Sequence, residues 1–149
     1  MSPPCEFNKS YPSVIRSETE MFKDLTYFLN ANNVTEERTR DIQLCVSEAF
    51  NNAALHGNRL DPAKQVKLRL EVNRTSVIAD IIDEGQGCVS DIQQRREPSS
   101  LDETGRGVNL MYVRADDVIL TSVEGGGLSV RLIFGDNVFR TKTVTKNAR

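Results

Sequence analysis

Residues 47–57 read SEAFNNAALHG, which places an acid and a carboxamide four residues apart on a predicted helix. Because side chains at i and i+4 share one face of a helix, Glu48 and Asn52 can converge on a single metal–phosphate group. The apolar positions that recur at helical spacing are Ile42, Val46, Ala49 and Ala53. Glu48 and Asn52 lie at the margin of that apolar stripe, where residues that face a cleft are expected.

Two glycine-containing blocks follow this helix. Residues 83–87 read DEGQG and come directly after an apolar strand, and residues 104–111 read TGRGVNLM and lead into a further helix. Taken singly, such blocks fit a turn or a solvated helix face. In this order and spacing, the three blocks together indicate a nucleotide site.

The remaining pattern predicts an α+β fold. Thr35, followed by two acids, is a good N-cap for the helix that ends at Gly57. The other predicted helices span residues 13–31 and about 106–114, and the predicted strands span residues 7–11, 66–72, 77–82, 118–123 and 128–134. We expect a two-layer α/β sandwich with three main helices on one face of a mostly antiparallel, mixed sheet. The polar residues 88–104 are predicted to form a mobile flap between the glycine blocks.

Composition favours one small domain over residues 1–149, with a flexible basic tail from about residue 138. The chain has 149 residues, of which 38% are hydrophobic, and no apolar run approaches the ~20 residues of a membrane span. The beginning of the chain lacks signal-peptide features, so we expect a cytoplasmic protein without a membrane partner. A net charge of −2 argues against direct nucleic-acid binding, and three cysteines without a C-x-x-C pair indicate neither disulfides nor zinc.

The three blocks resemble the N, G1 and G2 boxes of the GHKL ATPase superfamily. Within it, the chain looks most like the small anti-sigma factor serine/threonine kinases, whose motif S-E-A-x-x-N-A-x-x-H-G is matched by residues 47–57. The resemblance extends from about Phe7 to about Phe134. It implies the Bergerat fold, with ATP and Mg²⁺ as cofactors.

The resemblance also implies roles for the residues around the nucleotide. Glu48 would be the general base and Asn52 the Mg²⁺ ligand, whereas Asn51 lies about 100° away around the helix. Asp83 would accept a hydrogen bond from the adenine amine. Gly85 and Gly87 would let the backbone pass close to the base, which a Cβ would obstruct.

At the other end of the nucleotide, the amides near Gly105 and Gly107 would bind phosphate oxygens at a helix start. Arg106 could reach a phosphate or pair with Glu103, and both possibilities stay open. His56 is better explained by a structural role than as a zinc ligand, since it is the single histidine. No lysine lies between residues 88 and 104, so charge neutralisation would depend on Mg²⁺, on backbone amides and on arginines, for which Arg95, Arg96 and Arg106 are the candidates.

The function implied by this resemblance is a partner switch. Such a protein binds a sigma factor, acts as a homodimer, and uses ATP to phosphorylate a Ser or Thr of a STAS-domain anti-anti-sigma factor. Two alternatives remain at this stage. One is a non-catalytic, ATP-gated binding module, and the other is a histidine kinase catalytic domain acting in trans.

Overall fold

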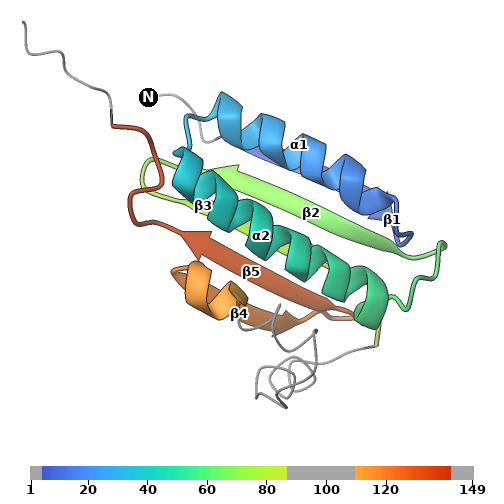
Figure 1. Ribbon diagram of the computed structural model, residues 1–149. Helices are drawn as coiled ribbons and strands as arrows, with labels where there is room; N and C mark the ends of the chain where they lie inside the picture. Colours follow the sequence, from blue (N-terminus) through green and yellow to red (C-terminus); the bar gives the residue numbers. More distant parts are fainter. Residues whose placement is uncertain (1–4, 87–109, 142–149) are drawn as a thin grey trace, which may run out of the picture.

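The computed structural model describes residues 5–86 and 110–141 (Figure 1). Its elements are β1 (Cys5–Pro12), α1 (Ser17–Ala31), α2 (Glu36–Asn52), the π-helical turn η1 (Ala53–Gly57), β2 (Gln65–Val72), β3 (Val77–Ile82), β4 (Asp117–Ser122) and β5 (Leu128–Phe134). Residues 110–114 are also helical, and the predicted beginning of that helix lies outside the described residues. Within the described ranges, no helix is both long and apolar enough to cross a membrane.

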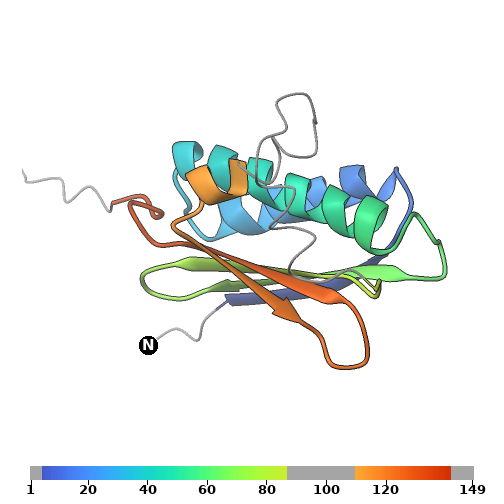
Figure 2. The same ribbon diagram turned by 90° about the horizontal axis from the view of Figure 1, so that it is seen from below.

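The strands form one sheet in the order β1-β2-β3-β5-β4, and every neighbouring pair is antiparallel. All described helices lie on one face of this sheet, as Figure 2 shows from the side. The predicted two-layer α+β architecture is therefore confirmed. The sequence pattern also suggested some parallel pairing, which is not found among the described strands.

The core lies between the sheet and the two long helices. Strand β2 alternates as predicted, with Val66, Leu68 and Leu70 fully buried, while β3 is buried along nearly its whole length. Helix α1 contributes Met21, Leu25 and Leu29, and helix α2 contributes Ile42, Val46 and Phe50. Each helix and the sheet has one apolar face, so the two layers pack together with these faces inward and remove them from water.

One of the two predicted helix starts agrees with the structure, and the other differs from it. Thr35 is the N-cap of α2, as predicted, and its hydroxyl oxygen accepts from the Arg38 amide at 3.2 Å. Helix α1, however, begins at Ser17 instead of Ser13. Ser13 is buried and donates both its amide and its hydroxyl to the Lys64 carbonyl, so residues 13–16 form a turn. That long-range contact is invisible to helical periodicity.

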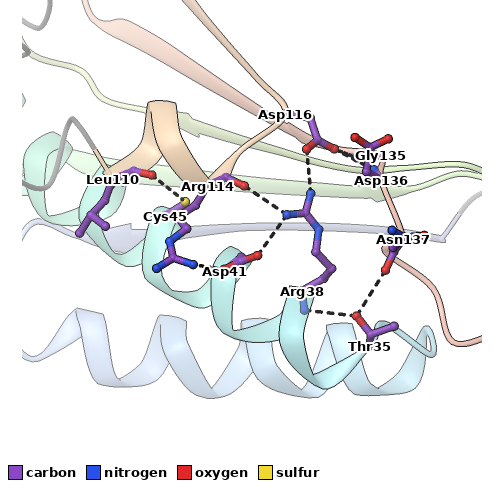
Figure 3. Close-up of polar contacts among 10 residues, drawn as sticks. All are labelled: Thr35, Arg38, Asp41, Cys45, Leu110, Arg114, Asp116, Gly135, Asp136 and Asn137. Atoms are coloured by element: carbon purple, nitrogen blue, oxygen red, sulfur yellow. Dashed lines mark hydrogen bonds and ion pairs between the residues drawn. The ribbon is translucent and has the colours of Figure 1, made fainter.

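A cluster of charged residues joins the start of α2 to the segment just before β4 (Figure 3). We call it the Arg38 cluster, and it comprises Arg38, Asp41, Arg114 and Asp116. The Arg38 guanidinium donates to the Asp41 carboxylate at 3.1 Å, to the Arg114 carbonyl at 3.2 Å and to the Asp116 carboxylate at 3.0 Å. It also lies over the Phe134 ring, 5.4 Å from the centroid. A planar cation with several donors suits this role because three acceptors surround one partly buried position.

Asp116 connects this cluster to the chain after β5. Its second oxygen accepts from the backbone amides of Gly135 and Asp136. Burial alone would raise the pKa of Asp116, but these amides and the Arg38 guanidinium lower it below its ordinary value. Nearby, the buried Cys45 thiol donates to the Leu110 carbonyl, and burial raises its pKa to about 12. The start of α2, residues 110–116 and the chain after β5 are thus held together.

Replacement of Arg38 by alanine should lower the free energy of unfolding by about 2 kcal/mol, because two partly buried carboxylates lose their cation. Arg69→Ala is the matched control, since Arg69 is 44% exposed and lies 3.9 Å from Glu6. Its loss should cost at most about 0.5 kcal/mol. Urea denaturation would measure both changes, and equal losses would contradict the structural role of the Arg38 cluster.

Candidate nucleotide-binding site

The predicted pair Glu48 and Asn52 lies on the last turns of α2. Asn52 is 8% exposed and Glu48 is half-buried, and both line a pocket of about 420 Å³ between the start of α1 and the end of α2. Figure 1 shows that these two helix ends lie side by side. Asn51 is less buried than Asn52, as its position around the helix predicts. A carboxylate and a carboxamide therefore share the concave end of the helix layer.

The environment of Glu48 changes its acidity. Burial raises the pKa of Glu48, and the negative charge of Glu18 on α1 raises it further. A carboxylate whose pKa is raised towards neutral binds a proton more strongly than an exposed one. Glu48 is therefore better suited to accept a proton than an ordinary surface glutamate.

Asp83 lies directly after β3 and is 5% exposed. One carboxylate oxygen, Oδ1, accepts from the Gly85 amide at 2.9 Å and from the Leu128 amide at 3.1 Å. The Asp83 amide in turn donates to the Leu128 carbonyl at 3.0 Å. These three hydrogen bonds fix the orientation of the carboxylate at the end of the sheet.

Glycines bring three backbone segments into contact around Asp83. A Cβ at Gly57 would overlap the Asp83 carboxylate, and a Cβ at Gly85 would overlap the Gly57 carbonyl. A Cβ at Gly127, where φ is +109°, would overlap the Asp83 carbonyl. From the sequence, Gly85 was predicted to let the backbone pass close to a nucleotide base. In the structure, the end of η1 already requires a glycine there.

The turn that follows Asn52 is wider than the α-helix predicted for it. Residues 53–57 form a π-helical turn, in which the Asn58 amide donates to the Ala53 carbonyl at 2.8 Å. Such turns are frequent at functional sites. This one carries Gly57 to the Asp83 carboxylate, and His56, which it also contains, is exposed.

Asn58 is a positioning residue that sequence reasoning missed. It is 1% exposed, and its side-chain amide donates to the Ser13 hydroxyl at 2.8 Å and to the Gln65 carbonyl at 2.9 Å. Its side-chain oxygen accepts from the Glu84 amide at 2.8 Å. Asn58 therefore connects the turn before α1, the first residue of β2 and the segment after β3. In the sequence it looks like an ordinary loop asparagine.

The structure places Glu48 and Asn52 on one pocket at the end of α2, and Asp83 and Gly85 against Gly57 at the end of η1. Gly87, Gly105, Arg106 and Gly107 lie outside the described residues, as does the predicted flap at residues 88–104. The predicted tail from about residue 138 is described only as far as residue 141, and Val138 is buried there. The phosphate-binding roles at the second glycine block stay predictions.

This fold and this arrangement of an acid, an amide and a strand-end aspartate define a class of nucleotide-binding domains. A profile of the histidine kinase-like ATPase domain matches residues 12–134. The chain therefore belongs to the histidine kinase-like ATPase family, within the GHKL anti-sigma kinases, as the resemblance of the three blocks predicted. Membership of this family implies ATP binding.

Individual relatives agree with this assignment. The anti-sigma F factor of Geobacillus stearothermophilus is 32% identical over 124 residues, which cover 78% of this chain and 84% of the relative. The anti-sigma F factor of Halalkalibacterium halodurans is 28% identical over 149 residues, covering 95% of this chain and 94% of the relative.

A solved structure shares the fold at lower identity. It contains the RsbU and RsbW domains of Rv1364c from Mycobacterium tuberculosis, with a TM-score of 0.61 and 18% identity. The match covers 95% of this chain and spans about a third of that longer chain, namely 35%.

Gly85→Ala should lower the free energy of unfolding by about 2 kcal/mol or more, since its Cβ would overlap backbone that has no room to move. Gly135→Ala is the control, because a Cβ there would make only ordinary contacts, 3.6 Å from Asp116 Oδ2 and 3.8 Å from the Thr75 carbonyl. That change should stay within about 0.5 kcal/mol. Urea denaturation of both variants checks the result, and a tolerated Gly85→Ala would contradict the close approach to Gly57.

Glu48→Gln should stabilise the protein at neutral pH, raising Tm by about 1–3 °C, because the amide avoids the cost of a partly buried charge. The folded-state pKa of Glu48 is raised above its ordinary value of 4.5, so its destabilising effect is present at neutral pH. It disappears as pH falls through the folded-state pKa and below 4.5, where Glu48 is protonated in both states. Thermal unfolding between pH 3.5 and 8 tests this, and the exposed Glu124→Gln serves as the control. A constant difference at every pH would contradict the explanation.

Proposed function

We propose that this chain is an ATP-dependent serine/threonine protein kinase that also acts as an anti-sigma factor. Its protein substrate would be a STAS-domain anti-anti-sigma factor, phosphorylated on one Ser or Thr. The observation that carries the kinase half is the Glu48–Asn52 pair at the end of α2, beside an Asp83 carboxylate held by two backbone amides. The anti-sigma half is supported by the relatives that bear that name.

The donor groups of the site fit Mg-ATP. Asn52 offers an amide oxygen, the type of ligand that Mg²⁺ accepts alongside phosphate oxygens and water. When bound, Mg²⁺ would neutralise charge that develops on the transferred phosphoryl group. Asp83 would accept from the adenine amine, and its fixed orientation supports selection of that base. Gly87 would let the backbone pass close to the base, and the amides near Gly105 and Gly107, together with Arg106, would bind phosphate oxygens.

Glu48 would act on the acceptor hydroxyl. As the Ser or Thr oxygen attacks the γ-phosphorus of ATP, Glu48 takes the hydroxyl proton, and the bond from that phosphorus to the ADP oxygen breaks. The products are a phosphoester on the partner and ADP. The raised pKa of Glu48 suits this step because a general base is most effective when its pKa lies near the working pH.

Further parts of the proposal concern the whole protein. We expect residues 1–149 to act as one domain, in the cytoplasm and as a homodimer, with a sigma factor as the second partner. The alternative is a non-catalytic, ATP-gated binding module, which the absence of a lysine between residues 88 and 104 favours. In that case nucleotide binding would change partner affinity without phosphoryl transfer.

The kinase proposal is tested by transfer of labelled γ-phosphate from Mg-ATP to the STAS-domain proteins of the same genome. Glu48→Ala should reduce transfer by about 10²-fold or more while Mg-ATP still binds, because only the base is lost. Asn52→Ala should weaken Mg-ATP binding by about tenfold, since a metal ligand is removed. Calorimetry would measure that affinity.

Gln43→Ala is the matched control for Asn52→Ala, because it removes a carboxamide of the same helix that does not line the pocket of Glu48 and Asn52, and its Mg-ATP affinity should be unchanged. Transfer that survives Glu48→Ala at the wild-type rate would refute the base role. Nucleotide-dependent binding of a STAS protein without transfer would establish the ATP-gated module instead.

A further inference from the structure

A groove runs between the start of α1 and the end of α2, beside the candidate catalytic glutamate. We define the α1–α2 groove by six of its lining residues, Val14, Ile15, Glu18, Glu48, Leu55 and Leu60. Three of its apolar side chains are reached by solvent: Ile15 is 78% exposed, Leu55 48% and Leu60 37%. Exposed apolar side chains that gather around one concavity are typical of interaction sites.

The turn that carries Leu60 is conformationally costly. Arg59 and Leu60 have φ values of 53° and 54°, the left-handed region that favours glycine. The Leu60 amide donates to the Ala54 carbonyl at 2.8 Å, which holds the turn against the end of η1. A strained backbone that presents a partly exposed leucine to a groove gains little core packing. Such strain is found where function requires a particular geometry.

The charges in the groove are of one sign. Glu18 on α1 and Glu48 on α2 both line it, and among its described lining residues there is no Lys or Arg. The ion pairs found between described residues include neither glutamate. The mutual repulsion contributes to the raised pKa of Glu48. An apolar groove with two neighbouring carboxylates is complementary to a segment that has both an apolar and a cationic side chain.

We propose that the α1–α2 groove binds the acceptor segment of the STAS-domain substrate, with an apolar side chain against Ile15 and Leu55 and a Lys or Arg paired with Glu18. This inference rests on the proposed kinase function. Because Glu48 belongs to the same groove, a segment docked there brings its Ser or Thr hydroxyl to the proposed base. Glu18 is thus a specificity-determining residue that selects a basic residue near the phosphorylated hydroxyl.

The experiment measures the affinity of the full chain, saturated with a non-hydrolysable ATP analogue, for each STAS-domain protein of the same genome. Glu18→Lys reverses the groove charge, and Glu37→Lys is its control because both acids lie in the first turn of a helix. Leu55→Asp tests the apolar wall, with Tyr27→Asp as control, since Tyr27 is 79% exposed on α1 outside the groove. Mg-ATP affinity is measured in parallel for all four variants, so that STAS binding is compared only where each variant is saturated with nucleotide.

We expect Glu18→Lys and Leu55→Asp each to weaken STAS binding by about tenfold and to raise KM for the STAS protein far more than they lower kcat. The two control variants should bind like wild type. Replacing the partner's basic residue near its phosphorylated hydroxyl by Glu should restore binding to Glu18→Lys, which a merely structural effect could not do.

Two results would overturn the groove assignment while leaving the kinase intact. In the first, wild type phosphorylates a STAS protein, and both groove variants bind it with unchanged affinity. In the second, the groove variants change the oligomeric state in light scattering and leave STAS affinity unchanged, which would place a second copy of the chain in the groove. If wild type neither binds nor phosphorylates any STAS protein, the proposed function fails, and this inference fails with it.

Discussion

The arrangement of the candidate site depends on the contacts that the Asp83 carboxylate makes with three backbone segments. Its Oδ1 accepts from the amides of Gly85 and Leu128, which fastens the end of β3 to the beginning of β5. Its other oxygen lies so close to Gly57 that no larger residue fits there. The end of η1 is consequently held against the end of β3 through Gly57. A charge-assisted hydrogen bond with two amide donors is well suited to this because it is directional and strong.

The costliest left-handed residues lie at one end of the fold, because those at the other end, Asn33 and Asn137, are asparagines, which tolerate this conformation. The half-buried Glu48, the π-helical turn after Asn52 and the left-handed residues Arg59 and Leu60 all lie near the end of α2. The opposite end, by contrast, contains the Arg38 cluster, whose charges compensate one another. Natural proteins commonly keep strain where binding or catalysis needs it and compensate elsewhere. The distribution seen here is consistent with a rigid scaffold that carries a reactive end.

Most secondary structure followed from local patterns. The alternation in β2, the apolar run of β3 and the Thr35 cap were predicted and are confirmed, because each depends on residues only a few positions apart. The beginning of α1 was predicted four residues too early, since the Ser13–Lys64 hydrogen bonds that replace its first turn join segments far apart in the chain. Asn58 was missed for the same reason. Its three partners come from three segments that are distant from one another in the chain: the turn before α1, the start of β2 and the residues after β3.

The sequence by itself determined the fold class and the family, through its periodic patterns and its three motif blocks. It also determined that Glu48 and Asn52 share a helix face, because helical periodicity fixes which side chains lie together. Only the tertiary structure decided the environment of those side chains. Burial between α1 and α2 raises the pKa of Glu48, the widened turn carries Gly57 to Asp83, and the strained loop adds Leu60 to the groove. Each of these features arises where segments distant in sequence meet in space, and no local pattern of residues encodes such a meeting.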